Sequence, residues 1–388
     1  MKNSTFLSCL IGLFFLTLTL NLSAQSNTLS DDGLAKRILI TSPTIEQLQA
    51  IQSSGLDLHC GAKFEGENLR LDLQYSEVLL INELGLSFQV IEEDLSTFFE
   101  ERAAATLPQA RIELEQMKQE ALIAQEQRNS LSTGDASIES FIQREACDEI
   151  DWVAQNFRLG GFNDPAVSFG GCLTVDEVNI ELDRMRALFP HLISIRQDAS
   201  ITPLDPSPMQ THGNMTVTPF DPQTIWYVRI SDNPDQDETG EPESLITGMT
   251  HAREVNSMMN IIYYMWWVLE NYDTEPAIRN LVDNQELYFI PIVNPDGVKW
   301  NEIIRPNGGG LQRKNLRPGV NDCGDIACSN GDLPCSPFST QLQMNALRGV
   351  DLNRNASYYW GFDDFGSSPD QCRDTYSCLL YTSPSPRD

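Results

Sequence analysis

Basic residues and histidine are both scarce in this chain of 388 residues. Lysine and arginine number 26 against 55 aspartates and glutamates, which gives a net charge of −29 at pH 7. A nucleic-acid-binding surface needs clustered positive charge to neutralise phosphates, so this balance argues against nucleic acid as a partner. It argues equally against a polybasic membrane anchor. Only four histidines occur, and none of them follows His251.

Long apolar runs are also missing beyond the N-terminus. Residues 1–24 combine Lys2, a short apolar stretch and small residues at Ser23 and Ala24, a pattern typical of a cleaved signal peptide. No later segment reaches the roughly 18 consecutive apolar residues of a membrane helix. We therefore expect export to a secreted or periplasmic location, with no membrane span in the mature chain.

Eight of the nine cysteines lie after this signal peptide, where export makes disulfides permissible. Cys323, Cys328 and Cys335 crowd one polar loop, and a structural zinc site there is an alternative to disulfides. Their spacing does not fit a zinc knuckle well, so the sequence favours disulfides without fixing their connectivity.

Residues 30–100 predict a small α+β domain of the ferredoxin-like, β-α-β-β-α-β kind. Strands are expected at 36–41, 56–60, 69–73 and 86–90, and helices at 44–54 and 76–84. Thr44 and Gln47 have the spacing of a capping box at the first helix. Residues 101–146 predict a linker whose helix, at 108–129, is solvent-exposed because its apolar stripe is thin.

Residues 147–376 predict an α/β domain with a mixed, largely parallel sheet flanked by helices. Thr174 and Glu177 form a second capping box. Apolar strands at 225–230, 245–249 and 287–293 surround a long helix at 254–270. Ligand sites in such sheets gather at the carboxyl ends of the strands, and His251 and Asn294 both follow a strand.

His251 and Glu254 are a candidate metal pair. An imidazole and a carboxylate three residues apart, where a strand leads into a helix, can converge on one zinc ion. The H-x-x-E pattern alone is weak evidence, because a chain this acidic produces it by chance.

The context of that pair resembles the zinc metallocarboxypeptidases of the carboxypeptidase A/B type. The similar segments, in order, are GMTHARE at 248–254, VNPDG at 293–297, RKN at 313–315, VDLNRN at 350–355 and the stretch 366–376. Residues 30–100 are similar, more faintly, to the activation domain of these enzymes.

The resemblance implies a role for each matching residue. His251 and Glu254 would be ligands of one Zn²⁺ ion, and Arg313 would be the catalytic residue that polarises the scissile carbonyl. Asn353 and Arg354 would bind the terminal carboxylate of a peptide or protein substrate with a free C-terminus, since the planar fork of arginine matches a carboxylate.

The chain also departs from the family. A third zinc ligand, a catalytic glutamate and a substrate-binding tyrosine are expected after the Asn-Arg pair, and the third ligand is absent from this chain. Residues 377–388 lose the resemblance and are a suspected non-native tail. The expectation is therefore a C-terminally truncated, inactive fragment of a secreted carboxypeptidase precursor. Two alternatives remain open: a zinc N-acyl amino-acid amidohydrolase, and a metal-free peptide-binding domain.

Overall fold

A computed structural model describes residues 33–56, 58, 61–132, 153–199, 223–316, 349–356, 367–368 and 373–377, with backbone alone for 127–132. The predicted signal peptide, the predicted tail apart from Ser377, and every cysteine except Cys172 lie outside these residues. Cys172 forms no disulfide. Among the helices that the structure describes, none combines the length and apolar character that a membrane crossing requires.

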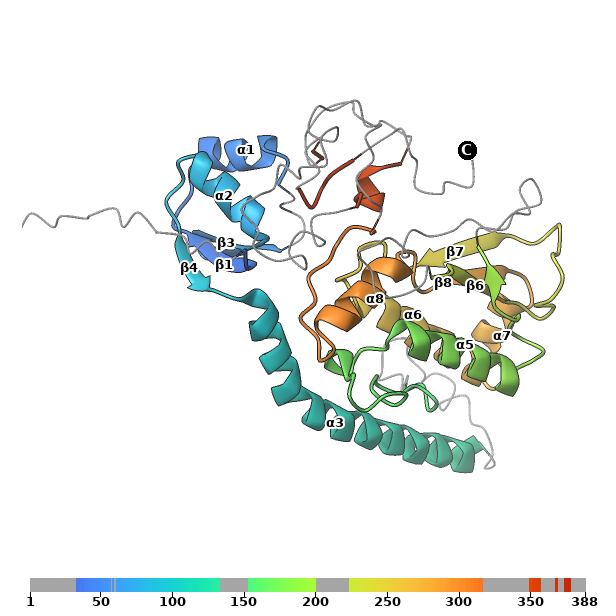
Figure 1. The fold of residues 1–388 in the computed structure, drawn as a ribbon. Coiled ribbons are helices and arrows are strands. Elements are labelled where there is room, and N and C mark those ends of the chain that lie inside the picture. The colour runs from blue at the N-terminus through green and yellow to red at the C-terminus, as the bar shows by residue number, and fades with distance from the viewer. Residues whose placement is uncertain are drawn as a thin grey trace, which may run out of the picture.

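The N-terminal domain is a four-stranded sheet with two helices (Figure 1). Its elements are, in order, β1 (Lys36–Ile40), α1 (Ile45–Ser53), β2 (Ala62–Glu65), β3 (Asn68–Leu73), α2 (Tyr75–Glu83) and β4 (Gln89–Glu92). The strands are arranged β2-β3-β1-β4, and all neighbours are antiparallel. Alternate residues of β1 and β3 are buried, and the register sets Ile38 opposite Leu71. The predicted element order is confirmed, but the second strand begins at Ala62; part of the 56–60 prediction lies outside the described residues.

Local hydrogen bonds explain why α1 begins where the sequence predicted. The Gln47 amide donates to Thr44 Oγ1 at 3.2 Å, and the Thr44 amide donates to Gln47 Oε1 at 2.8 Å. The same reciprocal arrangement, between Thr174 and Glu177, opens α5 (Val175–Leu188). Both capping boxes are therefore confirmed.

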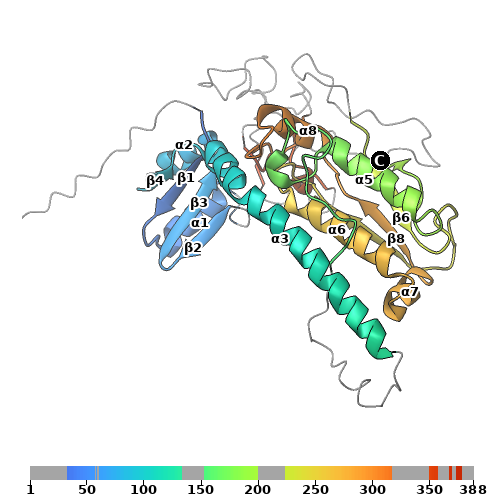
Figure 2. The ribbon, with the colours of Figure 1, turned by 90° about the horizontal axis from the view of Figure 1, so that it is seen from below.

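The linker helix differs from its prediction in length and in environment. α3 (Leu95–Ser132) begins 13 residues before Pro108 and continues through it. Asp94 starts it: its carboxylate accepts the Thr97 amide at 3.1 Å and the Thr97 hydroxyl at 2.6 Å. The helix leaves the N-terminal domain and runs along the second unit (Figures 1 and 2). There Arg111 donates to the Gly160 carbonyl at 2.6 Å, so this helix is packed on one side rather than wholly exposed.

The second unit has an α/β fold, but its sheet is not largely parallel. The strands β5 (Gln197–Asp198), β6 (Trp226–Ile230), β7 (Glu243–Thr247) and β8 (Glu286–Ile290) lie in the order β5-β6-β8-β7. Among the strands that the structure describes in this unit, only β7 and β8 run parallel; the β5–β6 and β6–β8 pairs are antiparallel. Two helices between β7 and β8 provide the crossover that a parallel pair needs, whereas β6 enters the sheet from the opposite direction.

The helices α5, α6 (Asn256–Asn271), α7 (Pro276–Val282) and α8 (Pro295–Ile304) complete this unit. α6 places the fully buried Trp266 in the main core. The Trp266 indole N–H donates to Glu181 Oε2 at 2.7 Å, and Arg158 pairs with the same buried carboxylate at 2.7 Å. The aromatic ring thus gains burial without leaving its polar atom unsatisfied.

Hydrogen bonds between described residues join the N-terminal domain to the second unit. Arg373 donates to the Ser76 carbonyl at 2.9 Å, Thr375 donates to the Gly55 carbonyl at 2.8 Å, and Gln74 donates to the Leu311 carbonyl at 3.1 Å. Two of them come from one short segment, 373–377, so this segment anchors the domain.

A buried carboxyl group lies in the same interface. Glu77, near the start of α2, is 6% exposed. Burial and the carboxylate of Asp374 raise the pKa of Glu77 to about 7, against the opposing charges of Arg253 and Arg373. Burial is the largest cause, and these three charged groups all belong to the second unit, so docking contributes to the shift in the pKa of Glu77.

We predict that Glu77 makes the docked structure more stable in acid. The pKa of Glu77 in the folded protein exceeds its ordinary value of 4.5. The protonated Glu77 side chain therefore contributes fully to the free energy of unfolding below about pH 4.5, and this contribution is lost as the pH rises through about 7. The difference amounts to about 3 kcal/mol. Urea unfolding between pH 5 and 8 measures it, and Glu77→Gln should remove this part of the pH dependence.

Glu83→Gln is the matched control, because Glu83 is an exposed carboxylate on the same helix. It should leave the pH profile of the unfolding free energy unchanged. Identical profiles for the unaltered protein and Glu77→Gln would show that Glu77 is not the titrating group.

Candidate functional site

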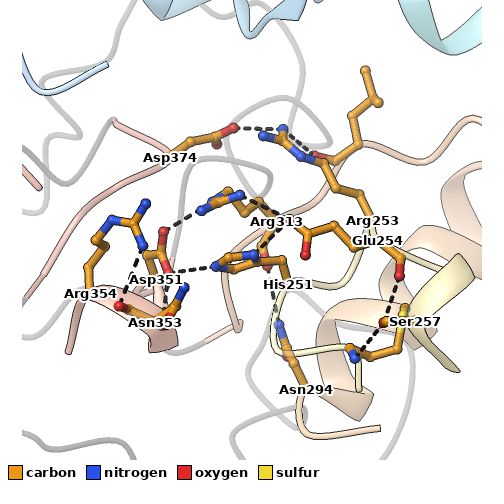
Figure 3. Close-up of polar contacts among 12 residues, drawn as sticks. His251, Arg253, Glu254, Ser257, Asn294, Arg313, Asp351, Asn353, Arg354 and Asp374 are labelled. Atoms are coloured by element: carbon orange, nitrogen blue, oxygen red, sulfur yellow. Dashed lines mark hydrogen bonds and ion pairs between the residues drawn. The ribbon is translucent and has the colours of Figure 1, made fainter. Parts of the chain in front are cut away.

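The loop from β7 to α6 carries His251 and Glu254, and its backbone is strained. Met249 has φ of 52° and is 1% exposed, an uncommon conformation for a buried residue with a side chain. Ser257 closes this loop: its hydroxyl accepts the Met249 amide at 3.0 Å and donates to the Glu254 carbonyl at 2.8 Å (Figure 3). One side chain therefore holds both ends of the segment that carries the candidate ligands.

The carboxyl ends of the two parallel strands meet at this loop, as the sequence predicted. The Asn294 amide donates to the Met249 carbonyl at 3.1 Å. Asn294 is the N-cap of α8, where its side chain accepts the Gly297 amide at 3.1 Å. Gly297 is needed here because a Cβ at this position would lie 2.7 Å from the Cβ of Ala252.

His251 and Glu254 face each other, and their role as zinc ligands stays a prediction. His251 Nδ1 lies 2.7 Å from Glu254 Oε1. The His251 ring is buried, whereas the Glu254 side chain is 42% exposed, so the pair opens toward solvent on the carboxylate side. Burial would raise the pKa of Glu254, but the hydrogen bond and charge of His251 lower it.

The other ring nitrogen of His251 is held by Asp351. Nε2 lies 3.0 Å from Asp351 Oδ1, and the Asp351 side chain is fully buried. Burial alone would lower the pKa of His251, but its hydrogen bonds with Asp351 and Glu254 raise it. Burial would likewise raise the pKa of Asp351, yet the hydrogen bond from His251 and the charge of Arg313 lower it to about 2.

Asp351 is a site residue that the sequence interpretation missed. Its motif, VDLNRN, was used for Asn353 and Arg354, but the acid two residues earlier was assigned no role. A carboxylate on the distal nitrogen fixes the tautomer and orientation of a metal-binding histidine. The sequence signal is only an acid inside a motif of binding residues, and its burial and its role become apparent in the folded structure.

Arg313 lies inside the same cluster and is 1% exposed. Its Nε donates to Asp351 Oδ2 at 3.0 Å, and its Nη1 donates to Glu254 Oε1 at 3.2 Å. Its carbonyl accepts the Ala252 amide at 3.0 Å. Arg313 thus contacts the loop that carries both candidate zinc ligands, and it also contacts the buried Asp351.

Asn353 and Arg354 follow Asp351 in a short 3-10 turn (Leu352–Arg354). The Asp351 carboxylate accepts the Asn353 amide at 2.9 Å, and the Asp351 carbonyl accepts the Arg354 amide at 3.0 Å. Asn353 is exposed and Arg354 is partly exposed. Figure 3 shows both beside Asp351, on the side opposite Glu254. The structure therefore brings together all five residues that the sequence nominated.

The donor set fits zinc, with two candidate ligands. Imidazole nitrogen and carboxylate oxygen are ordinary zinc donors, and here they converge while a buried carboxylate holds the far side of the imidazole. Within the described residues, no third histidine, cysteine or acid joins His251 and Glu254 in a cluster of metal-binding size. His191 packs its ring against Tyr272, while His59 and His212 lie outside the described residues.

Comparison with known proteins shows which family the region around this site resembles. Residues 218–378 match the sequence model of the family described as zinc carboxypeptidase. This match includes every residue of the cluster, so this region of the chain is similar to zinc carboxypeptidases. Zinc is the family's cofactor, and hydrolysis is its chemistry.

Curated relatives share the same region. A zinc carboxypeptidase of Saccharothrix mutabilis subsp. capreolus is 35% identical over 137 residues, covering 35% of this chain and 25% of the relative. Metallocarboxypeptidase A of Trichophyton tonsurans is 32% identical over 139 residues, covering 36% of this chain and 26% of the relative. The matched segment thus spans about a quarter of the length of these relatives.

Solved structures with a similar arrangement include carboxypeptidase A from Helicoverpa armigera, at 17% identity and a TM-score of 0.47, covering 90% of this chain and 64% of that one. Thrombin activatable fibrinolysis inhibitor has a TM-score of 0.43 at 15% identity, with 89% and 64% coverage.

We predict that Asp351→Ala strongly destabilises the fold. It would leave Arg313 and His251 buried without their shared carboxylate, and breaking a buried charge pair costs about 3–5 kcal/mol. Urea unfolding at pH 7 measures the loss. Asp235→Ala is the control, because Asp235 pairs with Arg186 at 2.8 Å while 52% exposed. That exposed pair should cost at most about 1 kcal/mol. Equal losses for the two variants would contradict a special role for Asp351.

Proposed function

We propose that this protein is a zinc-dependent metallocarboxypeptidase that releases C-terminal residues from peptides. The observation that carries the proposal is the placement of His251 Nδ1 against Glu254, with Nε2 held by Asp351 and with Asn353 and Arg354 on the neighbouring turn. Two metal donors and a carboxylate-binding pair are thereby grouped around one buried acid.

His251 and Glu254 are the residues that would hold zinc. Zinc bound there would supply Lewis-acid polarisation of the scissile carbonyl and activation of the attacking water. Asp351 orients the imidazole, because its carboxylate accepts a hydrogen bond from Nε2–H and leaves the Nδ1 lone pair available beside Glu254. The family resemblance also implies that Arg313 polarises the scissile carbonyl, and that role stays a prediction.

Arg354 supports recognition of a free C-terminus. Its guanidinium has a planar fork that matches a carboxylate with two parallel hydrogen bonds. The exposed Asn353 amide, one residue before it, adds a donor on the same turn. Peptide and protein substrates with a free terminal carboxylate fit this pair.

The N-terminal domain is proposed to be an activation-peptide-like, ferredoxin-like domain that keeps the enzyme latent. Its α2 docks beside the site: Glu77 lies near Arg253, and Arg253 pairs with Asp374 at 2.7 Å. Arg253 is the residue before the ligand Glu254, so the docked domain occupies the rim of the site. The signal-like residues 1–24 support a secreted or periplasmic enzyme.

The first test of the proposed function concerns Arg354. In the active enzyme, Arg354→Ala should cost about 2–5 kcal/mol in kcat/KM for peptides with a free C-terminus, because a desolvated charge pair loses one partner. Amidated peptides should lose far less. Arg279→Ala, an exposed arginine on α7, is the control and should leave both substrates unaffected. Equal losses for free and amidated peptides would assign Arg354 a structural role.

The second test concerns latency. Trypsin should raise activity by cutting between residues 101 and 157, because exposed connectors are where nicking concentrates. Arg102, Arg111, Lys118 and Arg128 all lie within α3, whose hydrogen-bonded backbone resists cleavage, so we expect the productive cut at Arg144, which follows the last residue of that helix. Arg144→Gln should then slow activation. Activity that does not rise after cleavage would remove the idea of a latent precursor.

A further inference from the structure

One face of α3 is covered along much of the helix. Between residues 101 and 121, the residues that are not exposed recur at intervals of three and four, which is the spacing of a single helical face. They are Ala103, Leu107, Ala110, Leu114, Lys118 and Ala121. Leu114 packs against the main core of the second unit. This otherwise polar helix therefore has one continuous contact face.

Under the first half of this face, the second unit presents glycines instead of side chains. A Cβ at Gly170 would lie 3.3 Å from the Ala103 Cβ, and a Cβ at Gly171 would lie 2.5 Å from Leu107 Cδ1. The second distance is well below a van der Waals contact between carbons, which is about 3.5–4.0 Å. The position that Leu107 occupies therefore requires that Gly171 has no side chain.

Gly309 lies closer still, at the first turn of the helix. A Cβ there would overlap the Ser96 carbonyl oxygen and lie 3.3 Å from the Glu100 amide nitrogen. Both are backbone atoms, so a side chain at Gly309 could be accommodated only by moving the helix itself. Farther along, a Cβ at Gly161 would lie 3.2 Å from Arg111 Nη2. These four positions form a glycine track: Gly161, Gly170, Gly171 and Gly309.

The turn geometry of these glycines does not by itself account for the close approach. All four have a positive φ, between 66° and 89°, which favours glycine wherever it occurs. Gly66 and Gly85 also have a positive φ, of 63° and 69°, yet a Cβ at either position would meet no atom within 4 Å. Positive φ and close packing are therefore separate properties, and the glycine track combines them where α3 crosses it.

Polar contacts hold the helix along the same stretch. The Arg111 guanidinium donates to the Gly160 carbonyl at 2.6 Å, and Arg305 pairs with the Glu100 carboxylate at 3.4 Å. One contact lies near each end of the glycine track. The helix is thus fixed both by shape and by charge.

The glycine track is also close to the place where the N-terminal domain docks. The Leu311 carbonyl, two residues beyond Gly309, accepts the Gln74 side chain of that domain at 3.1 Å. Only residues 93 and 94 separate the end of β4 from the start of α3. Because two residues reach at most about 7 Å, a helix seated on the track restricts where the domain can lie.

We propose that the glycine track is a helix-docking surface, that its occupant is α3 of the same chain, and that this contact keeps the N-terminal domain seated beside the site. The track suits a helix with small side chains where it crosses, as at Ala103, because a glycine backbone permits close approach. The consequence for latency rests on the proposed function, whereas the docking of the helix does not.

The experiment compares Ala103→Leu with Ala104→Leu in the full chain. Both changes keep a strong helix former, but Ala103 faces the track whereas Ala104 is exposed on the same turn. Hydrogen exchange followed by mass spectrometry reports the opening of the amides at 96–111. Thermal unfolding shows whether each variant is folded.

We expect Ala103→Leu to speed exchange at 96–111 by about 5–150-fold, the factor that corresponds to the usual cost of overpacking a contact. Ala104→Leu should leave this exchange unchanged, because its side chain extends into solvent. Equal exchange rates in the two variants would overturn the proposal.

Gly309→Ala tests the other side of the contact, and it decides the question if Ala103→Leu does not fold. Its control is Gly66→Ala, which introduces the same backbone strain at a positive φ without meeting a neighbouring atom. Gly309→Ala should speed exchange at 96–111, whereas Gly66→Ala should only lower the unfolding temperature. Exchange at 96–111 that is the same in both glycine variants would also overturn the proposal.

Activity before trypsin treatment separates this proposal from the proposed function. In the active enzyme, Ala103→Leu should hydrolyse peptides before trypsin treatment faster than Ala104→Leu does. Faster exchange without faster hydrolysis, in an enzyme that trypsin activates, would overturn the claim that the track keeps the domain seated beside the site. No hydrolysis by the trypsin-treated, unaltered enzyme would instead refute the proposed function, and the exchange rates would still decide whether α3 docks on the track.

Discussion

A fully buried carboxylate, Asp351, is the constraint on which the site depends. An ionised acid without solvent is tolerated only if donors replace the lost water. Those donors come from separate parts of the chain: the His251 ring, the Arg313 guanidinium and the Asn353 amide. Folding must therefore bring the β7–α6 loop, the segment after α8 and the turn at 351–354 to one place. The group that makes the site costly to assemble is also the group that orients the candidate zinc ligand.

The parallel pair of β7 and β8 supplies the frame for this assembly. Because both strands end at the same edge, the loops that follow them lie side by side and exchange backbone hydrogen bonds, as between Asn294 and Met249. Close approach then depends on small residues. A Cβ at Gly248 would lie 2.8 Å from Ile261 and 2.9 Å from the Pro291 carbonyl, so a side chain there would push the loop away from the sheet. Backbone strain at Met249 accompanies this tight fit, and the Ser257 hydroxyl offsets part of it.

Features fixed by local chemistry could be predicted from the sequence, and features fixed by distant contacts could not. Thr44 and Thr174 cap their helices through bonds spanning three residues, so their spacing was sufficient evidence. The His251–Glu254 pair was predictable for the same reason. The direction of β6 is set by its pairing with β8, about 60 residues away, and no periodicity reports that pairing. Pro108 suggested a helix start, but packing along the second unit and the Asp94 cap outweigh its missing N–H. Asp351 was missed because its role appears only once His251 and Arg313 surround it.

The N-terminal domain and the site carboxylate share one short segment. Thr375 donates to the Gly55 carbonyl of the domain, and the carbonyl of the next residue, Tyr376, accepts the Asp351 amide at 2.9 Å. Asp374, which precedes Thr375, pairs with Arg253, and Arg253 lies between the two candidate ligands in sequence. Three consecutive residues therefore contact the domain, the backbone of the buried acid and the ligand loop. Because these contacts belong to one stretch of backbone, the position of the domain and the geometry of the site constrain each other, and neither is an independent feature of the fold.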